Sequence, residues 1–149
     1  MAVQSSPMYL LEPYRGIFEK VQNVDLSKVM TRVKKHQPNL DSAEAEKQYK
    51  YFMYLCCTNN GYLPVPNKLV DEVWHSHILF TSDYSEFCDQ VAGKFVHHCP
   101  ITEDLSGVEL KDRRQTMADF SKKHFGFYPF KQGCYSDCGA MADCGAMAN

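Results

Sequence analysis

Apolar residues recur with the period of an α-helix in two segments, and this pattern limits the fold more than any other feature. In residues 41–57 they fall at the i, i+3, i+4 and i+7 spacing of one buried face: Tyr49, Phe52, Met53 and Cys56. In residues 67–81 a second face gathers Leu69, Val70, Val73, Trp74, Ile78 and Phe80. No segment alternates apolar and polar residues for long enough to predict a sheet, and we expect at most a short strand at residues 95–96. The sequence predicts an all-α fold.

Capping residues and helix breakers set the bounds of the predicted helices. One helix follows Asp25 and ends before Pro38, and the sequence DSAE at residues 41–44 has the form of a capping box. Two prolines in LPVPN (residues 63–67) separate this second helix from the next, which runs from about 67 to 80. A short helix from 81 or 82 to Gly93 and a charged helix from Ser106 to about Gly126 complete the pattern. We expect five or six helices in one compact domain, residues 1–130.

The last segment, residues 131–149, differs in composition. It contains two identical copies of the hexapeptide DCGAMA, residues 137–142 and 143–148. Glycine and alanine offer little surface to bury, so we expect a flexible tail that is available to a protein partner. Its thiols, Cys134, Cys138 and Cys144, do not follow any common zinc or iron–sulfur spacing. They remain candidates for thiol or metal chemistry.

Charge and hydropathy exclude few function classes but favour one location. The net charge of −2 gives no support for nucleic-acid binding. The first residues lack the features of a signal peptide, and no stretch approaches the roughly 20 apolar residues of a membrane span. We therefore expect a cytoplasmic protein, in which the seven cysteines are mostly thiols.

Two histidines stand in the middle of the second apolar segment, in VWHSHILF at residues 73–80. On a helix, two residues correspond to about 200° of rotation, so the two imidazoles point in different directions. His77 falls near the centre of the apolar face and needs a buried partner. His75 lies on the flank of that face, one turn after Asp71, where the two side chains can meet.

Three more potential ligands, His97, His98 and Cys99, follow the next predicted helix in what we expect to be a loop. Two antiparallel helices joined by a short turn would return this loop to the start of the first helix, close to Asp71 and His75. Histidine, aspartate and cysteine are the usual ligands of zinc and of several transition metals. We therefore predict a metal site there. Only one of the two adjacent histidines is expected to bind, and Asp71 could be a ligand or could orient a ligand histidine.

The segment PVPNKLVDEVWHSHILFTSDYSEFC (residues 64–88) resembles the signature of the glycine-rich domain-containing protein-like family, and GKFVHHCP (residues 93–100) resembles its small bacterial members. The residues that match the signature are Pro66, Val70, Asp71, Trp74, His75, His77, Tyr84 and Cys88. The resemblance covers about 40 residues strongly and implies that this set matters, but it implies no agreed chemistry.

Two functions compete at this point. The first is a small metal-binding protein in which Asp71, His75 and His97 or His98 hold the ion, with His77, Tyr84, Trp74, Cys99 and Cys88 nearby. Zinc is the default ion, iron and copper stay open, and so does the question whether the protein is an enzyme. The alternative is a non-enzymatic interaction module in which the same motif is a structural knot in the core.

Overall fold

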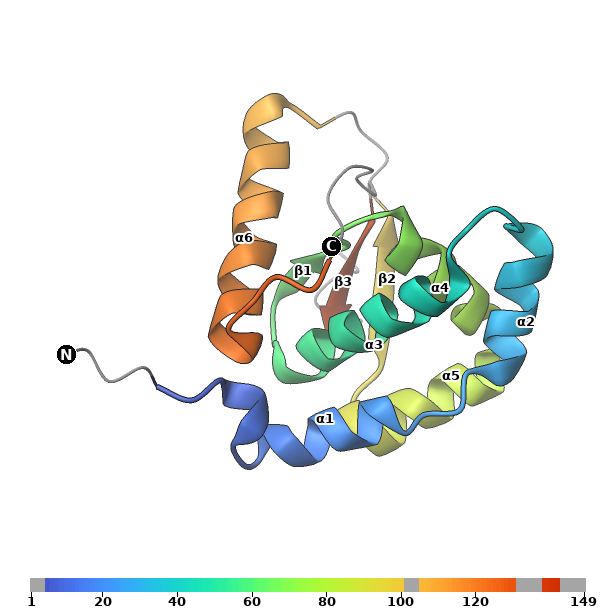
Figure 1. Ribbon diagram of the computed structural model, residues 1–149, viewed down its shortest axis with the longest axis horizontal. Coiled ribbons are helices and arrows are strands. Elements are labelled where there is room, and N and C mark those ends of the chain that lie inside the picture. Colours follow the sequence, from blue (N-terminus) through green and yellow to red (C-terminus); the bar gives the residue numbers. More distant parts are fainter. Residues whose placement is uncertain (1–4, 101–104, 131–137, 143–149) are drawn as a thin grey trace.

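The computed structural model describes residues 5–100, 105–130 and 138–142 (Figure 1). Within these ranges the chain is all-α in character, with six α-helices and a few short strands, as the sequence predicts. A short 3₁₀ turn, Met8–Leu10, precedes α1 (Tyr14–Gln22), α2 (Ser27–His36) and α3 (Ser42–Thr58). Then come β1 (Tyr62–Pro64), α4 (Lys68–Leu79) and α5 (Thr81–Phe87), which continues as a π-helical turn, Cys88–Ala92. Strand β2 (Val96–Pro100), α6 (Gly107–Phe125) and β3 (Cys138–Ala142) complete the order.

Two of the predicted helix caps, those of α3 and α6, are observed, whereas the cap position of α2 is Leu26, and Asp25 before it accepts a hydrogen bond from the N–H of Ser27. Asp41 accepts a hydrogen bond from the backbone N–H of Glu44 at the start of α3, and Ser106 and Glu109 form a reciprocal capping box at the start of α6. Gly93 and Gly126 end their helices with φ angles of 69° and 81°, a conformation that costs glycine little. These helix ends could be predicted from the sequence because each capping contact forms within one helical turn.

Helix α3 lies at the centre of the core. Nine of its residues are buried, and it packs against α1, α2, α4 and α6. The buried face includes the predicted stripe of Tyr49, Phe52, Met53 and Cys56. Phe52 meets the ring of Trp74 on α4, with ring centroids 5.3 Å apart. The packing of α3 on α4 fixes which side of α4 faces the core.

A three-stranded antiparallel sheet with the order β1-β3-β2 is the main difference from the sequence prediction. Residues 97–99, expected in a loop, lie in β2, and residues 138–142 of the tail form the middle strand. The strands have only three to five residues, too few for an alternating pattern, and β3 is rich in glycine and alanine. Such residues favour strands weakly, so pairing between distant segments and not local preference creates this sheet. Cys134 and Cys144 lie outside the described residues.

Candidate metal centre

The start of helix α4 is anchored to α3 by the residue that caps it, Asn67. Asn67 caps it, because its side-chain oxygen accepts a hydrogen bond from the N–H of Val70 at 3.0 Å. The amide nitrogen of the same side chain donates to Gln48 of α3 at 2.8 Å, in a buried contact. This pair was not predicted from the sequence, although an asparagine directly before an apolar helical run is a capping signal. Within this helix, Asp71 and His75 lie four residues, or about one turn, apart at the edge of the core.

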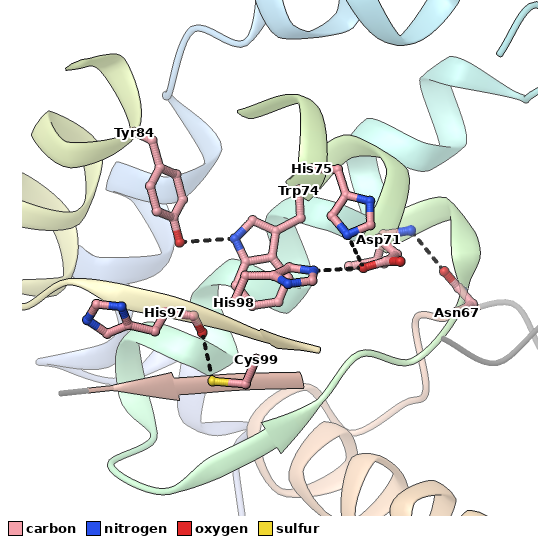
Figure 2. Close-up of polar contacts among 9 residues, drawn as sticks. Asn67, Asp71, Trp74, His75, Tyr84, His97, His98 and Cys99 are labelled. Carbon is pink, nitrogen blue, oxygen red and sulfur yellow. Dashed lines mark hydrogen bonds and ion pairs between the residues drawn. The ribbon is translucent and has the colours of Figure 1, made fainter. Parts of the chain in front are cut away.

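Asp71, His75 and His98 converge at this edge (Figure 2). One carboxylate oxygen of Asp71 lies 3.3 Å from Nε2 of His75 and 3.0 Å from Nε2 of His98. The imidazole rings of the two histidines lie 4.5 Å apart, centroid to centroid. Asp71 and His98 have 14% and 12% of their side-chain surface exposed, whereas His75 has 46% exposed. The cluster is therefore anchored in the protein on one side and open to solvent on the other.

The strand geometry of β2 separates the two adjacent histidines. Successive side chains of a strand point to opposite faces, so His98 reaches Asp71 while His97 points away from it (Figure 2). The ring of His97 packs near Phe95, with centroids 4.5 Å apart. Cys99 follows the same alternation, and its sulfur lies 3.7 Å from the backbone oxygen of His97. Only His98 of this run joins the cluster.

A buried hydrogen-bond chain connects α4 to the strand that carries His98. The indole nitrogen of Trp74 donates to the hydroxyl of Tyr84 at 3.0 Å, and that hydroxyl donates to the backbone oxygen of Val96. The Trp74 ring also meets the His98 ring, with centroids 4.4 Å apart. Burial raises the pKa of Tyr84 well above its ordinary value, so the hydroxyl remains a donor. Trp74 and Tyr84 thus hold β2 against α4 and set the position of His98.

His77 lies apart from the cluster, inside the core. It is 2% exposed, and its Nδ1 is 2.7 Å from the hydroxyl of Tyr49 on α3. Its ring packs against Tyr84 and Phe87. Burial lowers the pKa of His77 to about 4, so the ring is neutral near pH 7. The partner Tyr49, 28 residues away in sequence, could have been proposed only from its place on the buried stripe of α3.

Three cysteines of the helical domain are buried thiols without the features of a reactive site. Cys56, Cys57 and Cys88 are buried, and desolvation raises the pKa of each of them, to about 12 for Cys57. A high pKa disfavours the thiolate that would bind metal or act as nucleophile. These residues therefore act as small core side chains.

The cluster of Asp71, His75 and His98 could hold a metal ion. Two atoms that each lie about 2.0–2.1 Å from a tetrahedral ion are about 3.3 Å apart. The observed separations of 3.3 Å and 3.0 Å are close to that value, and the three donor atoms all lie within 4.8 Å of one another. Two imidazole nitrogens and one carboxylate oxygen occur together in zinc and iron sites that keep an open coordination position.

The fold and the cluster define an all-α protein with a small sheet and a histidine–carboxylate group at the edge of its core. A sequence profile of the UCP032817-like family matches residues 18–127, which contain the whole cluster, and the chain belongs to this family. Comparison with curated proteins and with solved structures gives no match. Within the described residues, no helix combines the length and the apolar composition needed to cross a bilayer.

Proposed function

We propose that the protein binds one divalent transition-metal ion through Asp71, His75 and His98. The observation that carries this proposal is the convergence of three donor atoms within 4.8 Å, contributed by a helix and a strand that are far apart in the sequence. Zinc is the default ion for this donor set, and iron is the principal competitor, because two histidines and a carboxylate also form the facial set of non-haem iron enzymes.

The burial of Asp71 supports this proposal. A carboxylate with 14% of its side chain exposed needs compensation for lost hydration. The hydrogen bond with His98 and the contact with His75 would supply part of it, and a divalent ion bound to all three groups would supply more. A metal held by only three side chains keeps a position for water and lowers the pKa of that water, which is the chemistry a hydrolytic enzyme would use.

A closer kinship with the glycine-rich domain-containing protein-like family is also part of the proposal. It is supported by the way in which the signature residues meet around α4: Asp71 and His75 at the cluster, and Trp74, His77 and Tyr84 in the buried contacts behind it. If this signature defines a shared site, relatives with the same D-x-x-W-H-x-H pattern should bind the same ion.

Elemental analysis of protein purified without a histidine tag tests the metal site. We expect about one equivalent of metal per chain, lost in His75→Ala and in His98→Ala. His97→Ala is the matched control, because it removes the adjacent imidazole from the opposite face of β2 and should keep the metal. Folded wild-type protein that contains no metal and takes up neither zinc, iron nor copper would contradict the proposal and favour an interaction module.

The single tryptophan offers an independent signal. Trp74 is the only tryptophan in the chain, and its ring lies 4.4 Å from that of His98. Paramagnetic Co²⁺ or Cu²⁺ bound at His98 should therefore quench its fluorescence, and His97→Ala should not change this quenching. Metal uptake without quenching would place the ion elsewhere.

A further inference from the structure

The tandem repeat and the sheet meet at β3. The first copy of DCGAMA is residues 137–142, and β3 is its last five residues, Cys138–Ala142. The second copy, residues 143–148, has the identical sequence and lies outside the described residues. The amino-acid sequence of strand β3, CGAMA, therefore occurs a second time in the same chain.

β3 occupies a slot between two strands that do not pair with each other. It is antiparallel to both, with Ala140 opposite Leu63 of β1 on one side and His98 of β2 on the other. Since the order is β1-β3-β2, the segment in the middle supplies the pairing for both neighbours. The slot between β1 and β2 is therefore filled by one extended segment of the chain.

A shift of six residues would place the second copy in this slot with every pairing preserved. Six is an even number, so the shift preserves the two-residue period of the strand. The residues that replace Cys138, Gly139, Ala140, Met141 and Ala142 would be Cys144, Gly145, Ala146, Met147 and Ala148. Only the connection after Phe130 changes, from seven residues to thirteen. Loop-closure entropy disfavours the longer connection by a factor of about two to three.

We propose that the slot between β1 and β2 accepts either copy of the repeat, so that two populations of the protein differ in the bound peptide. In one population Cys138–Ala142 is the middle strand, and in the other Cys144–Ala148 takes its place. Both arrangements support β2 in the same position, and the proposal does not depend on metal binding. The ligand of the slot is an extended peptide of small residues with the sequence CGAMA, supplied by the chain itself.

Proline substitutions at matched positions test the two populations. Proline removes the backbone donor that a middle strand needs on one side. If either copy can bind, Ala140→Pro and Ala146→Pro should each lower the Tm by about 3 °C or less, and the double variant should lower it by roughly 5 °C or more. The single variants are controls for each other, because they alter identical sequences. An Ala140→Pro variant as unstable as the double variant, with Ala146→Pro unchanged, would overturn the proposal.

Amide hydrogen exchange of the same full-length variants gives a second readout that does not require the double variant to fold. In Ala140→Pro the amide of residue 146 should become protected, and in Ala146→Pro the amide of residue 140 should be more protected than in the wild type. An unprotected residue 146 in Ala140→Pro would overturn the proposal. Sedimentation should show monomers, whereas a dimer of Ala140→Pro would show that a second chain, and not the chain itself, fills the slot.

Discussion

The two histidines of α4 lie two residues apart and have opposite environments. His75 has 46% of its side chain exposed and shares a carboxylate with His98, while His77 is 2% exposed and bonded to Tyr49. The cluster at the edge of the core consists of side chains from α4 and β2, whereas the contacts behind it, made by Trp74, His77 and Tyr84, tie α4 to α3, α5 and β2. One short motif therefore contains a structural half, the buried contacts of Trp74 and His77, and a second half, Asp71 and His75, that could bind a ligand.

The largest expected effect is on stability, at the buried histidine. His77→Ala should lower the free energy of unfolding by about 2–4 kcal/mol, because it leaves a cavity and removes the partner of the Tyr49 hydroxyl. His75→Ala is the matched control and should change it by about 0.5 kcal/mol or less, since a half-exposed side chain loses little packing. Urea unfolding of metal-free protein measures both. Equal losses would show that the two environments are not energetically different.

Asp71→Asn should have the next largest effect, on metal affinity and not on stability. The change keeps the shape of the side chain but removes the charge that attracts a cation. If the carboxylate binds the ion, affinity should fall by about 100-fold or more, whereas an orienting carboxylate costs about 10–100-fold. Competition titration with a chelator measures this loss. Unchanged affinity would exclude Asp71 from the site.

Tyr84→Phe tests the link between the two halves. The change removes the hydroxyl that joins Trp74 to the backbone of Val96, and we expect a loss of about 1–3 kcal/mol in the free energy of unfolding. Because β2 carries His98, metal affinity should fall as well. Tyr62→Phe is a suitable control, since its hydroxyl accepts a half-buried hydrogen bond from Arg113 of α6. Stability lost without any change in affinity would show that the cluster is positioned independently.

Acid should destabilise the fold through two buried histidines, His77 on α4 and His124 on α6. The pKa of His77 and of His124 is about 4 in the folded protein, because both rings are buried, and about 6.5 in the unfolded chain. Between pH 6.5 and 4 the unfolded chain binds protons that the folded protein does not, so stability falls as the pH falls. Each histidine contributes at most about 1.4 kcal/mol per pH unit, and His77→Gln should roughly halve the slope. A slope unchanged by this substitution would contradict the assignment.

Much of the fold could be predicted because its signals are local. The stripe on α3, the caps at Asp41 and Ser106 and the rotation of α4 all follow from side chains within two helical turns of one another. The contact between Asp71 and His75, one turn apart on the flank of α4, was predicted in the same way. The sheet was not, because β1, β2 and β3 are stabilised by partners 38 or more residues away in the sequence.

The choice between His97 and His98 depended on that unpredicted sheet. Adjacent histidines are equivalent in a loop, and only the alternation of a strand directs one of them to Asp71. Tyr49 could not be assigned as the partner of His77 for a similar reason, since the contact depends on how α3 packs against α4. Sequence periodicity places a residue on a face of its own element, but tertiary packing decides what that face meets.

The smallest expected effect is that of removing strand β3, which tests how far metal affinity at the cluster depends on the sheet. A chain that ends at Gly133 lacks β3, and β2 then keeps its contacts with α4 and α5. Those contacts include the Tyr84–Val96 hydrogen bond and the packing of His98 on Trp74, so we expect the metal to remain bound with an affinity lower by about 10-fold or less, or roughly 1 kcal/mol. A chain that ends at Ala142 keeps β3 and is the matched control, with an expected change of less than about twofold. Chelator competition measures both affinities, and circular dichroism confirms that each chain is folded. Complete loss of metal from a folded chain ending at Gly133 would mean that the sheet, and not the buried contacts of α4, positions His98.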